Sequence, residues 1–153
     1  MFPDHAAVDA LQMALRASCR ELVLIDADRQ QAVSQALDIA QTSALACGPR
    51  VRAGDYQDLA GAEAVVLAAG INEKAGGADR PGDKEGRLRL LDANVPRFCD
   101  VVPKTIAAAP GAVLLVTTNP LDVMTELTRR LAAAATRSLE RAPFWTACAS
   151  VPR

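Results

Sequence analysis

The chain has 153 residues, of which 50% are hydrophobic and 3% aromatic, with 17 Lys and Arg against 18 Asp and Glu. This length suits one domain with its own core and is short for a two-domain enzyme. A net charge of −1 gives no electrostatic reason to expect a nucleic acid or an anionic membrane as partner, and no apolar run approaches the ~20 residues of a membrane span.

Apolar periodicity and turn residues predict helices that alternate with short strands. In chain order they predict a helix over 6–18, a strand over 21–26, a helix over 28–44, a strand over 50–55, a strand over 62–70, a charged loop over 71–86, a helix over 87–109 bent at Pro96 and Pro103, a strand over 112–120 and a helix over 121–135. Strands separated by such helices form a parallel sheet with helices on both faces, an α/β fold.

The cysteines and the first residues indicate the compartment. Four cysteines are scattered without a CxxC spacing, so the sequence predicts neither a metal site nor a disulfide framework. The first residues lack the basic stretch and apolar core of a secretory signal. We therefore expect a reducing, cytoplasmic environment.

Small or polar residues end each predicted strand, and ligands of open parallel sheets bind beyond these carboxyl ends. These candidates are Asp26, Asp55, Ala69-Gly70 and Thr118-Asn119. Three of them have two interpretations, and Asn119 before Pro120 could form a turn or present its amide to a ligand. Asp26 could hold the hydroxyls of an adenosine ribose or cap the next helix, and Gly70 could admit a dinucleotide or only form a turn.

Together, these segments resemble the N-terminal half of the L-lactate/malate dehydrogenase family. The resemblance covers roughly residues 6–135, and its most specific pieces are the ELVLID strand, the GDY…LAGA…AAG block and the TNPLDVMT block. It implies a partial Rossmann-type NAD-binding domain. The implied activity is NAD-dependent oxidation of an L-2-hydroxy acid such as lactate or malate, with reverse reduction of the 2-oxo acid. Family members are commonly dimers or tetramers.

The resemblance also implies roles for single residues. Asp26 matches the acidic residue that holds the adenine ribose of NAD, and Ala69 and Gly70 match the segment along the cofactor. Asn119 matches the asparagine near the nicotinamide that also binds substrate. Arg87, seven positions before Asn94 in RLRLLDAN, matches the loop arginine that polarises the substrate carbonyl, because a guanidinium stabilises negative charge growing on oxygen.

The loop over 71–86 matches the mobile loop that closes over the active site in the family, and it is longer than the usual form. Two residues, one in the loop and one just after it, also depart from the family pattern. Glu73 stands where lactate enzymes carry Gln and malate enzymes Arg, so the particular 2-hydroxy acid stays unassigned. Arg89 replaces an Asp of the family pattern. The residues that could replace the missing carboxylate contact are Lys74, Arg80 and Lys84.

Two further parts of the family pattern are absent from the sequence. The family begins with a strand and a GxGxxG turn that binds pyrophosphate, but no glycine precedes Gly48. That strand is central in the usual sheet, so strands 21–25 and 64–69 must find other partners or the sheet divides. The catalytic histidine is also absent, because the single histidine, His5, matches no motif. We therefore expect this chain alone to be inactive.

Residues 1–137 are thus predicted to form a partial NAD-binding domain and 138–153 a non-native tail. Codons for APFWTACASVP (142–152), read one base out of frame, can translate into a segment that resembles the one expected next in the family. This favours a frameshift. Two alternatives stay open: a non-catalytic nucleotide-binding or interaction module, and assembly with a separately encoded C-terminal half.

Overall fold

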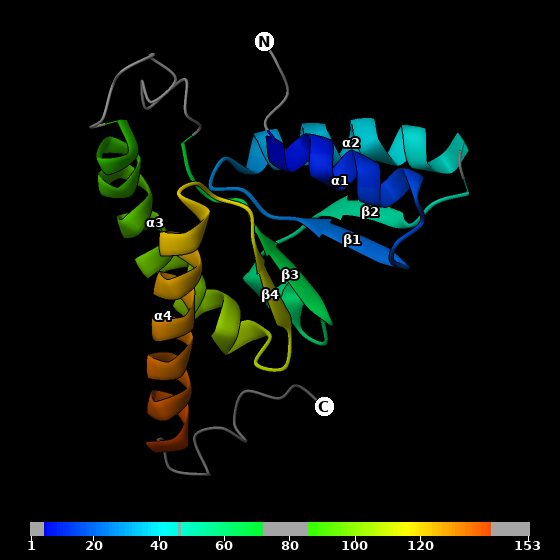
Figure 1. The fold of residues 1–153 in the computed structure, drawn as a ribbon. Coiled ribbons are helices and arrows are strands. Elements are labelled where there is room, and N and C mark those ends of the chain that lie inside the picture. Colours follow the sequence, from blue (N-terminus) through cyan, green and yellow to red (C-terminus); the bar gives the residue numbers. More distant parts are fainter. Residues whose placement is uncertain (1–4, 46, 72–85, 142–153) are drawn as a thin grey trace. The chain divides into compact units, whose positions relative to one another are not determined.

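Helices alternate with short parallel strands in the computed structural model, which describes residues 5–45, 47–71 and 86–141 (Figure 1). The side chains of His5, Arg87 and 136–141 lie outside that description. The elements in chain order are α1 (His5–Leu15), β1 (Glu21–Leu24), α2 (Arg29–Leu45), β2 (Arg50–Ala53), the short 3-10 helix η1 (Tyr56–Leu59), β3 (Ala64–Leu67), α3 (Gly86–Ala108), β4 (Val113–Val116) and α4 (Leu121–Arg141).

The predicted helices and strands are confirmed, with changed ends. Every strand stops earlier than predicted, so the candidate residues lie in the connections beyond the strands. α4 continues to Arg141, and α3 runs without interruption through Pro96 and Pro103. η1 was not expected. Residues 72–85, with Glu73, Lys74, Arg80 and Lys84, and the tail over 142–153 lie outside the described residues.

The strands form two parallel pairs, β1 with β2 and β3 with β4. The first pair belongs to Met1–Ala60 and the second to Gly61–Arg153, the two compact units into which the chain divides. We call these the first and the second unit. A division of the sheet is one of the two outcomes expected for this strand order without its central strand.

In the first unit, the helices pack on one face of the β1–β2 pair. The pair runs in register from Glu21↔Arg50 to Leu24↔Ala53. Its apolar face carries Leu22, Leu24 and Val51, which pack against the core residues Ala10, Ala14 and Ile39 of α1 and α2. Two of those three core residues are alanines, and Leu11 of α1 also packs against them.

Both helices of the first unit end without glycine at the left-handed position. Ala17 has φ 49° after α1 and Cys47 has φ 52° after α2. The amides that follow close the helix ends by bonding to the carbonyl five residues earlier. Ser18 N donates to Met13 O at 3.1 Å, and Gly48 N donates to Ser43 O at 2.8 Å. This is the Schellman pattern, in which glycine normally occupies the position that Ala17 and Cys47 hold here.

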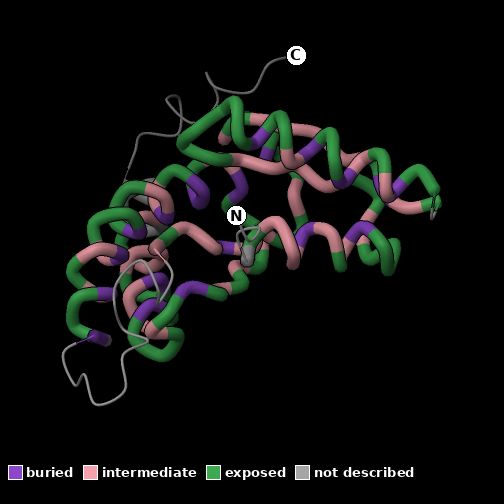
Figure 2. The backbone as a smooth tube through the Cα atoms, turned by 90° about the horizontal axis from the view of Figure 1, so that it is seen from above, coloured by how far each residue is buried: buried purple, intermediate pink, exposed green. Residues whose placement is uncertain are grey.

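In the second unit, α3 and α4 pack on one face of the β3–β4 pair. The core consists of Leu67, Phe98, Val102, Ile106 and Met124, with Val65, Leu114 and Val116 packed against it. Val113 and Leu115 point the other way along β4 and are 61% and 49% exposed. Figure 2 shows the resulting pattern along the helices, where buried positions recur between exposed ones. Among the described residues, no helix combines the length and hydropathy that crossing a membrane requires.

Candidate functional site

Asp26 lies just beyond β1 in the first unit, and its side chain is exposed. Its Oδ1 accepts a hydrogen bond from Asp28 N at 2.8 Å. The cap of α2 is Asp28, because Asp28 Oδ1 accepts from Gln30 N at 2.9 Å and from Gln31 N at 3.3 Å. The helix-cap interpretation therefore describes Asp28, and Asp26 instead closes a turn that presents its carboxylate beyond the strand.

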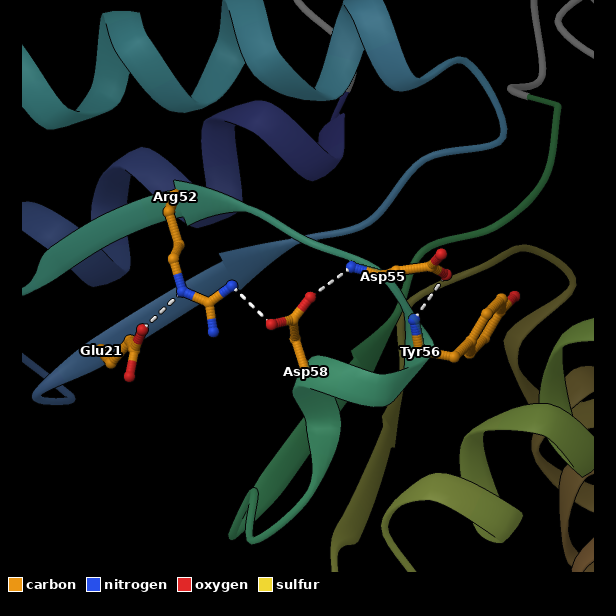
Figure 3. Close-up of polar contacts among 5 residues, drawn as sticks. All are labelled: Glu21, Arg52, Asp55, Tyr56 and Asp58. Atoms are coloured by element: carbon orange, nitrogen blue, oxygen red, sulfur yellow. Dashed lines mark hydrogen bonds and ion pairs between the residues drawn. The ribbon is translucent and has the colours of Figure 1, made fainter. Parts of the chain in front are cut away.

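Asp55 follows β2, and its side chain caps the short helix η1 (Figure 3). Its Oδ1 accepts from Tyr56 N at 2.7 Å, while its own N–H donates to Asp58 Oδ2 at 2.7 Å, so the two carboxylates cap η1. Arg52 joins this cap to the start of β1, with Nη1 2.7 Å from Asp58 Oδ1 and Nε 2.7 Å from Glu21 Oε1. The Asp55 N–H first, and Arg52 second, lower the pKa of the Asp58 carboxyl. The Asp55 carboxylate is thus engaged in holding the end of β2.

In the second unit, the segments that follow β3 and β4 are held side by side. Thr117 N donates to Leu67 O at 3.0 Å, which extends the strand pairing by one bond. The buried Thr118 hydroxyl lies 3.3 Å from Leu67 O and 3.2 Å from Ala69 O. Ala69-Gly70 and Asn119 are therefore neighbours at the carboxyl edge of this strand pair.

Asn94 of α3 joins the same two segments from below the surface. It is 0% exposed, its Oδ1 accepts from Ile71 N at 2.8 Å, and its Nδ2 donates to Asn119 O at 2.9 Å. Sequence reasoning used Asn94 only to locate Arg87. The available signal was the helical spacing of Asn94, four residues after Leu90 and four before Phe98, which puts an amide on the apolar face of the helix, where a buried polar group needs hydrogen-bond partners.

Gly70 is required by this packing. A Cβ built on Gly70 would lie 2.7 Å from Thr118 Cγ2 and 2.9 Å from Asn94 Oδ1. Neither of the interpretations of Gly70 in the sequence, a cofactor contact or a plain turn, includes this close approach. Asn119 is exposed and precedes Pro120 through a cis peptide bond.

The candidate residues thus fall into three groups. Ala69, Gly70 and Asn119 come together in the second unit, and Asp26 lies in the first. Arg87 is the second residue of α3, and its side chain is outside the described part of the structure. Within that part, no three His, Cys, Asp or Glu side chains gather as they would to hold a metal ion.

Parallel strands joined through helices, with exposed polar residues beyond their carboxyl ends, define an α/β fold of the Rossmann type. The family model of the lactate/malate dehydrogenase NAD-binding domain matches residues 6–139. The chain belongs to the lactate/malate dehydrogenase family, as its sequence motifs predicted, and the matched domain confirms NAD as the cofactor of that family.

Relatives and solved structures agree with this assignment. The chain is 44% identical over 126 residues to an L-lactate dehydrogenase of Chloroherpeton thalassium, covering 82% of this chain and 39% of that protein. It is 48% identical over 122 residues to an L-lactate dehydrogenase of Thermus aquaticus, covering 80% and 37%. A malate dehydrogenase of Archaeoglobus fulgidus, solved in complex with NADH, superposes with a TM-score of 0.70 at 30% identity, covering 83% and 41%. The chain thus spans about two fifths of the length of these proteins.

Proposed function

We propose that this chain is the NAD-binding part of an L-2-hydroxyacid dehydrogenase, which transfers hydride between a small acid such as lactate or malate and NAD. The observation that carries the proposal is the family match over residues 6–139. The arrangement beyond the strands supports it, because Asp26 and Asn119 are exposed there and hydrogen bonds from neighbouring residues hold them, to the Asp26 carboxylate and to the Asn119 carbonyl.

Asp26 would bind the adenine ribose. Its side chain is exposed, and the hydrogen bond from Asp28 N to one carboxylate oxygen restrains its orientation. A carboxylate at the end of this strand accepts hydrogen bonds from ribose hydroxyls and repels a 2′-phosphate. The chemistry of this residue therefore fits NAD.

Ala69, Gly70 and Asn119 would serve the nicotinamide end of the site. Ala69 and Gly70 would lie along the cofactor, and the side-chain amide of Asn119 would orient substrate and nicotinamide. Arg87 would polarise the substrate carbonyl through its guanidinium. NAD, when bound, would supply the hydride acceptor, while these residues bind and orient the reactants.

We expect no turnover of lactate or malate by the 153-residue chain alone. Its single histidine, His5, matches none of the family motifs, so no histidine is assigned to the proton transfer that accompanies hydride transfer. A missing general acid or base costs about 10²–10⁴-fold in rate. Cofactor binding is therefore the activity to test in this chain.

The first test is a calorimetric titration of the chain with NAD. Wild-type protein should bind NAD saturably, and Asp26→Ala should weaken binding about tenfold or more, since hydrogen bonds to a charged group contribute about 1.5–3 kcal/mol. Asp38→Ala is the matched control, because Asp38 is an exposed aspartate of α2 and its substitution should leave the affinity unchanged. Absence of saturable binding by the wild type, or equal loss in both variants, would contradict the proposal.

A further inference from the structure

Asn94 has features that the proposed function does not use. It is a fully buried amide on α3, and two of its hydrogen bonds reach main-chain atoms of distant segments. Ile71 lies 23 residues before it and Asn119 lies 25 residues after it. The bound groups are an N–H and a C=O beyond the last paired residues of β3 and β4, Leu67 and Val116.

The amide joins the two segments where the strand ladder has ended. Backbone groups within a strand pair form hydrogen bonds with the neighbouring strand, but the Ile71 N–H and the Asn119 C=O lie beyond the paired residues and need other partners. One side chain accepts from the first and donates to the second, with lengths of 2.8 Å and 2.9 Å. Beyond the bonds of Thr117 and Thr118 to Leu67 and Ala69, one buried amide thus links the two segments at Ile71 and Asn119.

We propose that Asn94 is a positioning residue for the nicotinamide end of the site, acting through the backbone of Ile71 and Asn119. The proposal depends on the proposed function, in which Gly70 and Asn119 contact the cofactor and substrate. Holding the Asn119 carbonyl fixes the backbone that carries the Asn119 side chain. Holding the Ile71 N–H fixes the chain immediately after Gly70. Asn94 itself is buried and touches neither ligand.

The chemistry at this position requires one acceptor and one donor. The two hydrogen-bond partners of the amide, the Ile71 N–H and the Asn119 C=O, are uncharged, and the backbone of Gly70 lies close to its Oδ1. A carboxylate in place of the amide could accept from Ile71 but would set its second oxygen against the Asn119 carbonyl. A protonated carboxylic acid restores the pattern, since its O–H donates and its C=O accepts. Burial and this repulsion raise the pKa of a carboxyl introduced here.

Asn94→Asp is therefore the decisive variant, measured at about pH 8 and about pH 5 beside the wild type at the same two pH values. We expect its NAD affinity to fall about tenfold at the higher pH and to return to within about twofold of wild type at the lower pH. Asn94→Ser, whose shorter side chain cannot reach both segments, should lose affinity at both pH values. Thr105→Val is the control, because Thr105 is buried in the same helix and its hydroxyl donates to Val101 O of that helix.

A second readout needs no ligand. In ¹⁵N NMR spectra, the Ile71 amide signal of Asn94→Asp should move and exchange faster with solvent at the higher pH, then recover at the lower pH. Far-UV circular dichroism reports whether the helices persist. If the wild type does not bind NAD, the proposed function fails, and pH-dependent recovery of the Ile71 signal still supports the positioning of this segment by Asn94. Affinity and Ile71 signals in Asn94→Asp that equal those of the wild type at both pH values would overturn the proposal.

Discussion

At Gly70, a Cβ would meet Thr118 Cγ2 at 2.7 Å and Asn94 Oδ1 at 2.9 Å. Neither neighbour can move easily. The Thr118 hydroxyl lies between Leu67 O and Ala69 O, and the Asn94 amide is bonded on both sides. The absence of a side chain at Gly70 is therefore a condition for the close packing of the two segments.

Gly70→Ala should lower the free energy of unfolding by about 1–3 kcal/mol, because the added methyl group overpacks a tight contact. Urea titration monitored by circular dichroism measures this change. Gly111→Ala is the matched control, since a Cβ there would meet nothing within 4 Å. That control should be neutral or stabilising by up to about 1 kcal/mol through a less flexible unfolded chain. Equal effects at the two glycines would contradict the importance of the contact.

The residue types in the sequence indicated which positions to consider, but they did not indicate which groups the side chains at those positions bond to. Asp26 and Asp28 both precede α2, and only the hydrogen bonds of Asp28 to Gln30 N and Gln31 N identify it as the cap. Asn94 was missed as a site residue because its partners lie more than twenty positions away in two different connections. Local periodicity describes which face of a helix is apolar, whereas such tertiary hydrogen bonds depend on the folded arrangement.

At the scale of elements, the helix pattern was predicted well and the strand ends were not. Apolar residues continue past two of the strands, Ile25 after β1 and Ala68 and Ala69 after β3, so the pattern overestimated the length of these strands. Pairing ends earlier for a physical reason. β2 stops at Ala53 because Asp55 caps η1, and β1 then has no partner residue beyond Leu24. A cap in one connection thus shortens the strand beside it.

The ends of α1 and α2 allow a prediction about stability. Ala17 and Cys47 occupy left-handed positions that cost a non-glycine residue about 1–2 kcal/mol, so Ala17→Gly and Cys47→Gly should each stabilise the first unit by about 1 kcal/mol. Ala44→Gly is the control, because Ala44 is an exposed helical residue of α2 and glycine there should destabilise by up to about 1 kcal/mol. Thermal denaturation of the three variants measures the sign, and destabilisation by all three would refute the cap assignment.

At the scale of the whole molecule, the family assignment and the fold class followed from motifs spread over the chain, but the division into two units depends on which strands pair. Each unit has its own parallel pair and its own core. The first core contains Ala10, Ala14 and Ile39, and the second contains larger side chains, including Phe98 and Met124. Because buried apolar area contributes most of the stability, the second unit should be the more stable of the two.

This organisation predicts that the two units unfold separately. Ile39→Ala should lower the stability of the first unit by about 2–4 kcal/mol, and Phe98→Ala should lower that of the second by about 3–5 kcal/mol. Amide hydrogen exchange resolves the two effects. Ile39→Ala should accelerate exchange of the β1 and β2 amides and leave those of β3 and β4 unchanged, and Phe98→Ala should do the reverse. If either variant accelerates exchange equally in both strand pairs, the chain unfolds as one cooperative unit, and the separate cores do not determine its stability.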